Sequence, residues 1–255
     1  MRNRGFRRGA SVFLNRRAGH TDAFTSSALI VSSTVGLLTD SFKPVGSALW
    51  LRPDTGVVAG TSWTDTMSGG GLVATAGGTT KPTVLATSGP NSTPVMAYTV
   101  ANASYHRVAT QGWVQPFFIW TVMKWTSASW ASNQYVFDGV TLNTDAFIWS
   151  GTTAVETYAG TAVQAWSAAS PKTFQAWGVY FAGAASYIAS NGTIEASGTN
   201  TGTSPPGGLT IGGPGDLASA AWSDAQVADI IVYTSLPSAG ELSRLAAYRL
   251  ARYGF

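Results

Sequence analysis

The sequence predicts an all-β sandwich that is closed by one short helix at its C-terminal end. Turn signals rich in glycine, serine and asparagine recur at short intervals from Ser47 onward, and 29 residues are glycine. The segments between them are rich in β-branched and aromatic side chains and often alternate in size, which is the pattern of strands in a sandwich. Helical periodicity is found at the end of the chain. A length of 255 residues suits one such domain.

Residues 1–45 precede the first predicted strand and form a basic arm. Positions 1–20 hold six arginines and no acidic residue, whereas the other nine basic residues and all twelve acidic residues come later. Such an arm typically docks on an acidic surface, and its spaced phenylalanines favour docking over a purely disordered tail. We therefore divide the chain into an arm, 1–45, and a domain, 46–255, and expect docking through Arg2, Arg4, Phe6, Arg7, Arg8, Phe13, Arg16 and Arg17.

A cleaved signal peptide is the competing interpretation of this end. Residues 28–38 are mildly apolar, and residues 46–48 have the small side chains of a cleavage site. The region before the apolar stretch is too long for a signal peptide, however, and the polar residues 32–34 interrupt the stretch. No segment approaches the roughly 18 uninterrupted apolar residues of a membrane-spanning helix. We expect a protein without a leader or a membrane segment.

The clearest strand patterns lie in the second half of the chain. Residues 117–125 carry bulky side chains on both faces, as a central strand buried on two sides should. Residues 173–181 show the same pattern. Residues 187–195 predict a hairpin, because Asn191-Gly192 tolerates the positive φ of a type I′ turn. The last strand is predicted within 222–233, and loops rich in Thr, Gly and Ala within 72–80 and 196–208.

The closing helix has defined ends. Ser238 is the predicted N-cap, and Glu241 three residues later completes a capping box. Gly254 supplies the C-terminal stop. The face that packs on the sandwich is predicted to consist of Leu242, Leu245, Ala246, Leu250 and Tyr253.

The ending resembles the close of bacterial and phage laminin-G-like domains, which belong to the concanavalin A-like lectin/glucanase superfamily. The resemblance rests on the turn and helix start at 236–241 and on the terminal Tyr-Arg-Leu-Ala-Arg-Tyr-Gly at 248–254. Further matches follow in the family's order at 49–54, 62–65, 116–119, 135–139, 186–198 and 208–213. The resemblance spans the chain from about Ser47 to its end. It implies a concanavalin A-like jelly-roll sandwich.

The carboxyl groups expected of a related glucanase are missing from the sequence. Glycoside hydrolysis uses two carboxyl groups that flank the scissile bond, and the related glucanases carry them as Glu-x-Asp-x-x-Glu. Glu156, Glu195 and Glu241 each lack another acidic residue within ten positions, although Asp138 and Glu156 remain a pair that folding can assemble. No Gly-x-Ser-x-Gly or P-loop motif is present, and His106 is predicted as a half-exposed residue at a strand edge. We expect no enzymatic activity.

We expect no metal or other cofactor, with calcium as the open alternative. The chain has no cysteine, which excludes thiolate metal sites. Calcium prefers six to eight oxygen ligands, usually with several carboxylates. Asp65 is expected to cap its own turn. The loop-side aspartates, none of them arranged as Asp-x-Asp, are Asp54, Asp65, Asp138, Asp145, Asp216 and Asp224.

Aromatic residues carry the best functional signal. Trp50, Trp120, Trp177 and Tyr233 lie within strand patterns and are predicted to be core residues. Other tryptophans lie at strand ends or in loops beside small polar residues, where they suit a glycan platform or a protein interface equally well. These candidates are Trp125, Trp130, Trp149, Trp166 and Trp222.

Together with the resemblance, these observations predict a non-catalytic phage virion structural protein. It would decorate the capsid or belong to the tail, dock on other virion proteins through its arm, form a homo-oligomer in the assembly and expose its jelly roll on the virion surface, with host glycans as possible ligands. Nucleic acid is not an expected partner. The alternative is a carbohydrate-binding or adhesion module that a bacterium secretes or displays on its surface.

Overall fold

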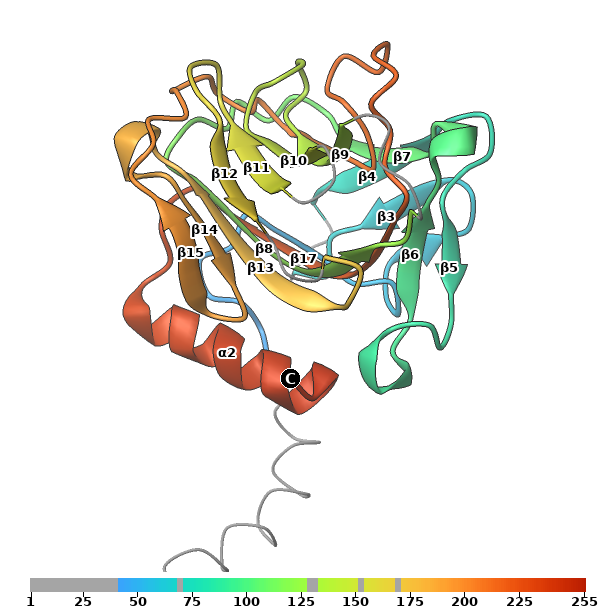
Figure 1. The fold of residues 1–255 in the computed structure, drawn as a ribbon. Coiled ribbons are helices and arrows are strands. Elements are labelled where there is room, and N and C mark those ends of the chain that lie inside the picture. Colours follow the sequence, from blue (N-terminus) through green and yellow to red (C-terminus); the bar gives the residue numbers. More distant parts are fainter. Residues whose placement is uncertain (1–40, 68–70, 128–132, 151–153, 168–170) are drawn as a thin grey trace, which may run out of the picture.

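Two antiparallel sheets lie face to face, and one helix packs on the outer face of one of them (Figure 1). The computed structural model describes residues 41–67, 71–127, 133–150, 154–167 and 171–255. The helix is α2 (Ala239–Tyr253), the last element of the chain. This arrangement confirms the predicted all-β sandwich with one C-terminal helix. The residues predicted to dock the arm lie outside the described part.

The sheet beneath the helix, sheet A, is built around the two longest strands of the described residues. Both have nine residues and pair along almost their whole length, β8 (Phe117–Trp125) with β17 (Ala225–Tyr233). The first strand also joins β17, so the two ends of the domain meet there. The order is β15 (Thr193–Ser197), β14 (Tyr187–Ser190), β13 (Gln175–Phe181), β8, β17, β6 (Val95–Tyr98) and β5 (Thr83–Leu85), with β1 (Leu49–Leu51) on β17.

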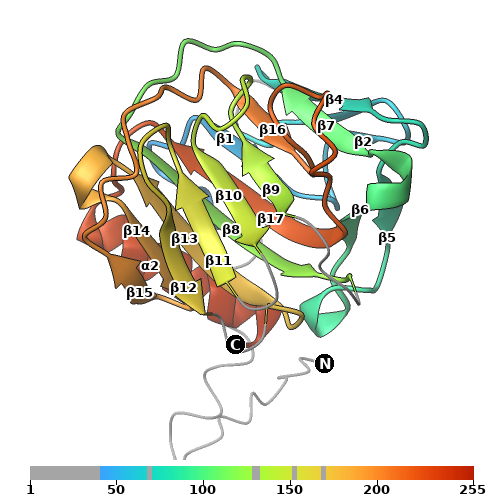
Figure 2. The same ribbon diagram turned by 45° about the horizontal axis from the view of Figure 1, so that its top comes forward.

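The opposite sheet, sheet B, has nine strands and lies in front of sheet A in Figure 2. Its order is β12 (Gln164–Ser167), β11 (Ala154–Tyr158), β10 (Ala146–Ser150), β9 (Gln134–Asp138), β16 (Leu209–Ile211), β7 (Tyr105–Val108), β4 (Val73–Gly77), β3 (Ser62–Thr64) and β2 (Val57–Val58). Three short 3-10 helices complete the described elements: η1 (Pro90–Ser92), η2 (Val100–Asn102) and η3 (Gly183–Ala185).

Two local predictions have different outcomes. Asn191 and Gly192 both have positive φ and connect β14 to β15, which confirms the predicted hairpin. The prediction of a loop across 72–80 is wrong, because β4 lies there. Strands on both sides, β3 and β7, pair with β4. This pairing overrides the weak strand propensity of its small residues.

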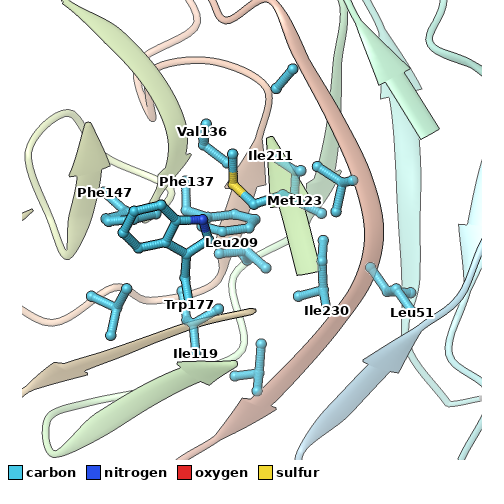
Figure 3. Close-up of a cluster of buried hydrophobic side chains, with 14 of the residues drawn as sticks. Leu51, Ile119, Met123, Val136, Phe137, Phe147, Trp177, Leu209, Ile211 and Ile230 are labelled. Carbon is cyan, nitrogen blue, oxygen red and sulfur yellow. The ribbon is translucent and has the colours of Figure 1, made fainter. Parts of the chain in front are cut away.

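The core between the sheets is aromatic and aliphatic (Figure 3). Trp177 and Phe147 are fully buried there, with ring centroids 5.6 Å apart. Trp125 is also fully buried, 5.9 Å from Trp177 and 5.6 Å from Phe147. Inward-facing residues of both sheets therefore form one close-packed layer.

A second buried layer joins sheet A to α2. Phe42 stacks on Tyr248 at 4.1 Å and meets Trp50 edge-on at 5.7 Å. Asp229 of β17 lies at the centre of this layer and accepts hydrogen bonds from Trp50 Nε1 (2.8 Å) and from the hydroxyls of Tyr248 (2.7 Å) and Tyr253 (2.9 Å). A buried carboxyl group thus finds three donors on two elements and fixes the helix on the sheet. Trp120 and Tyr233 also pack in this layer, and all four predicted core residues are buried.

The helix ends follow the prediction better than its packing face does. Ser238 Oγ accepts a hydrogen bond from the Glu241 amide (3.2 Å), and Gly254 has φ 81°. The capping box is only half formed, because the Glu241 carboxylate accepts from the Val45 amide and the Tyr233 hydroxyl (both 2.9 Å). The prediction that Ala246 and Leu250 pack on the sandwich is wrong, since both are exposed, Leu250 to 61%.

Candidate functional site

The outer face of sheet B carries the candidate site. Within the described residues α2 is the one α-helix, and it lies against sheet A (Figure 1). Successive side chains of a strand point to opposite faces. His106 and Val108 of β7 face the core, so Tyr105 and Arg107 face outward. No helix of the described part is long and apolar enough to cross a membrane.

Tyr105 and Trp222 form an aromatic pair on this face. Their rings are stacked, with centroids 5.8 Å apart and an angle of 25° between the planes, and both side chains are half-buried. A Cβ atom on Gly77 would overlap the ring of Tyr105, and one on Gly213 would overlap the indole of Trp222. The two glycines therefore let both rings lie close against the backbone of the sheet. The result is a half-exposed aromatic pair beside polar groups.

Tyr135 of β9 lies at the centre of a polar group next to this pair. Its hydroxyl donates to Asn143 Oδ1 (2.6 Å). Burial raises the pKa of Tyr135 to about 12, and the nearby carboxyl groups of Asp138, Asp216 and Glu156 add to this shift. The hydroxyl therefore stays protonated at neutral pH and acts as a hydrogen-bond donor.

One chain segment joins the polar group to the aromatic pair. The carbonyl of Ala221 accepts a hydrogen bond from the Tyr135 amide (3.0 Å), and the amide of Ser223 donates to the Gly212 carbonyl (3.0 Å). Trp222 lies between these two anchors. The backbone is therefore fixed directly before and directly after Trp222, and this positions its ring.

Asp138 fixes the two loops that border the site. Its carboxyl group accepts four backbone amides: Gly139 (2.9 Å), Asn143 (2.9 Å), Thr144 (3.0 Å) and Gly215 (2.9 Å). Burial raises its pKa to about 7. Asp138 and Glu156, the acidic pair considered in the sequence analysis, both lie near Tyr135. Both carboxyl oxygens of Asp138, however, accept hydrogen bonds from the loop amides.

Arg107 connects the same two loops from the face of the sheet. Its guanidinium group donates to the carbonyls of Val140 and Gly215. An arginine that bridges two loop carbonyls restricts their movement relative to each other. The polar border of the site is thus built before any ligand arrives.

The aspartates considered for calcium do not form a metal site within the described residues. Across the described ranges, no group of three or more His, Cys, Asp or Glu side chains is placed to hold a metal ion. Asp54 pairs with Arg52 and Arg252, while Asp224 accepts the Val100 amide (2.8 Å). Asp65 caps its turn as predicted, because its Oδ1 accepts the Met67 amide (2.9 Å).

The tryptophans predicted to form a glycan platform lie in different environments. Trp222 belongs to the site. Trp166 is half-buried and meets Trp177 edge-on at 5.8 Å, against the core. The prediction of Trp125 as a surface candidate is wrong, because it ends β8 with its side chain turned inward and fully buried. Trp149 lies in β10 with its side chain outside the described part, and Trp130 lies outside it altogether.

Sequence analysis missed Tyr105, Arg107, Tyr135 and Asn143. The usable signal was the alternation in Tyr105-His106-Arg107, which places the first and third residues on the same face. The prediction of His106 as a half-exposed edge residue is wrong, because β7 lies between β16 and β4. His106 is 2% exposed, its Nδ1 lies 3.0 Å from the Tyr98 hydroxyl, and burial lowers its pKa to about 4.

Comparison with known proteins shows the fold. No protein-family description and no curated protein matches the sequence. A Trypanosoma rangeli sialidase in complex with the inhibitor DANA is similar in structure, with a TM-score of 0.60 and 10% identity over 88% of this chain and 39% of the sialidase. Domain 4 of AbnA, a GH43 extracellular arabinanase from Geobacillus stearothermophilus, in complex with arabinotriose, has a TM-score of 0.59 and 11% identity over 80% of this chain and all of that domain.

A third similar structure is the binding domain of botulinum neurotoxin DC in complex with SialylT. Its TM-score is 0.55, with 10% identity over 83% of this chain and 52% of that chain. At these identities the likeness shows the β-sandwich fold alone. The chain spans less than half the length of the sialidase it matches.

The comparison corrects one expectation from the sequence. We expected no enzymatic activity because the Glu-x-Asp-x-x-Glu arrangement of the related glucanases is missing. The finding of sialidases among the similar structures contradicts that expectation. A missing motif of one enzyme family is therefore no ground for excluding activity in a fold that other enzymes contain.

Proposed function

We propose that this protein is a carbohydrate-binding module that binds glycans on the outer face of sheet B. The observation that carries the proposal is the pair Tyr105–Trp222, whose rings lie close over Gly77 and Gly213. A sugar ring has an apolar face of C–H groups, and aromatic rings provide the flat apolar surface on which such a face packs. The site therefore has the main element of a sugar platform.

The polar groups beside the pair suit the hydroxyl groups of a sugar. Asn143 and Asp216 provide amide and carboxylate groups, and the buried Tyr135 holds the Asn143 amide in place through its hydroxyl. Hydrogen bonds to Ala218 and Ser219 lower the pKa of Asp216, so it is ionised at neutral pH. Binding sites of small polar ligands combine an apolar surface with a few placed polar groups, and both are present here.

Two of the similar structures support this proposal, because each is a complex with a glycan. They are the arabinanase domain with arabinotriose and the neurotoxin domain with SialylT. This favours the alternative reading of the sequence, a secreted or surface-displayed carbohydrate-binding module. The virion role, with its arm-mediated partners and its oligomer, remains a prediction.

The test is glycan binding by the full chain and by Trp222→Ala. Glycan-array screening, followed by calorimetry with arabinotriose and the SialylT glycan, should identify a ligand. We expect Trp222→Ala to weaken its binding about ten-fold or more and Trp222→Phe to keep part of the affinity, because a smaller ring still packs on the sugar. The matched control is Phe174→Ala, which removes a half-buried aromatic ring just before β13 of sheet A, where Lys124 Nζ lies 4.7 Å from the ring centroid.

Two results would contradict the proposal. One is a folded Trp222→Ala protein that binds the glycan as tightly as the unchanged chain does. The other is an array without any ligand. The same glycans should be analysed for released sugars, since sialidases share the fold.

A further inference from the structure

A pocket of about 330 Å³ lies between α2 and the outer face of sheet A, on the side of the molecule opposite to the proposed glycan site. Its walls are Phe118, Trp120 and Tyr187 from the sheet and Leu242 and Leu245 from the helix. The volume lies at the lower end of the range of small-molecule sites, roughly 300 to 1,000 Å³. The pocket is apolar and partly aromatic.

Small residues on the sheet create the space. Ala176 and Gly178 of β13 and Ala189 of β14 line the pocket at positions where their neighbours along the strands point into the core. A Cβ atom on Gly178 would lie 3.2 Å from the Phe118 ring. Larger side chains in these positions would fill the gap beneath the helix, as core packing normally does. The hollow therefore follows from the side chains that the chain carries here.

Among the described residues that line the pocket, Arg249 is the one that carries a charge. Its Nε atom is buried and has no hydrogen-bond partner, and burial lowers its pKa. The other arginines of the described ranges are engaged: Arg52, Arg244 and Arg252 form ion pairs, and Arg107 donates to two carbonyls. A half-buried guanidinium group without an acidic partner is costly, because it loses water without gaining a counter-charge.

The geometry points to this pocket as a binding site for a small apolar compound that carries one carboxylate. The apolar part would fill the space between Trp120, Tyr187 and Leu242, and the carboxylate would accept hydrogen bonds from the Arg249 guanidinium group. Arginine binds carboxylates through paired, charge-assisted hydrogen bonds. In the part of the chain that the structure describes, no acidic side chain lines the pocket to compete for the arginine. The occupant thus supplies the missing counter-charge and the missing apolar contacts together.

Decanoate is a suitable probe, and decanol is its uncharged match. Calorimetry on the full chain should show one decanoate bound per chain and much weaker binding of decanol. Arg249→Gln should weaken decanoate binding at least about ten-fold and leave decanol binding unchanged, because it removes the charge and keeps a polar, hydrogen-bonding side chain. Ala246→Phe should abolish binding of both compounds, because Ala246 is an exposed helix residue at the pocket and a ring there occupies its volume.

Lys81→Gln is the control for loss of one positive charge, since Lys81 is exposed and lies outside the pocket. It should bind decanoate like the unchanged chain. The proposal is overturned if decanoate does not bind, if decanol binds as tightly, or if Arg249→Gln has no effect. It is also overturned if sedimentation shows a dimer that Ala246→Phe disrupts and decanoate does not, since a second copy of the chain would then occupy the groove.

Discussion

Among single residues, Asp145 shows most clearly what burial does to a charge. It is 1% exposed, its Oδ1 accepts from Gln115 Nε2 (2.7 Å), and its Oδ2 has no hydrogen-bond partner. Burial raises its pKa to about 8, and the neighbouring Asp138 adds to the shift. The folded protein therefore holds this proton where the unfolded chain has lost it, and the stability that the proton contributes disappears as the pH rises from about 4 through about 8.

Asp145→Asn should accordingly become more stable relative to the unchanged protein as the pH rises. Asparagine keeps the acceptor for Gln115 and tolerates the φ of 65° found at this position. Between pH 5 and 7 the difference in unfolding free energy should grow by up to about 1.4 kcal/mol per pH unit. Urea unfolding at several pH values measures it. Because burial lowers the pKa of His106, its contribution to stability rises with pH. His106 is present in both proteins, so this contribution cancels from the difference. A pH-independent difference would show that Asp145 is ionised in the fold.

At the scale of elements, α2 packs on sheet A through one of its faces. Leu245 is 1% exposed against sheet A, whereas Leu250 on the same helix is 61% exposed. Leu245→Ala should lower the unfolding free energy by about 2 to 5 kcal/mol, as large-to-small changes in cores do. Leu250→Ala should change it by less than about 0.5 kcal/mol. Equilibrium denaturation of both variants tests this. Equal effects would mean that the helix is not docked through its Leu245 face.

At the scale of the whole molecule, the described residues from Ser41 onward contain both buried layers. Phe42 belongs to the layer under α2, and the core between the sheets draws on both sheets. A chain that lacks residues 1–40 should therefore unfold in one cooperative transition, like the full chain. Calorimetric and van't Hoff enthalpies that agree for both chains would confirm this. A broad, non-cooperative transition of the shortened chain would assign residues 1–40 to the core.

The sequence by itself determined the elements whose signals are local. The mostly bulky strand β8, the Asn191-Gly192 turn and the Ser238 and Gly254 ends of α2 each rest on residues that act on their own stretch of backbone. The closing motif of the chain also predicted the sandwich. These features need no knowledge of distant residues, because propensity, turn geometry and capping operate within a few positions.

Only the tertiary structure decided which residues meet on the surface. Trp125 and Trp222 look alike in the sequence, yet one turns into the core and the other lies over Gly213 beside Tyr105. Gly77, under the Tyr105 ring, is far in the sequence from Trp222, and Gly213, under the Trp222 ring, is far from Tyr105. The direction of a side chain at a strand end depends on register and on the neighbouring strands, and these are set by pairings across the whole chain.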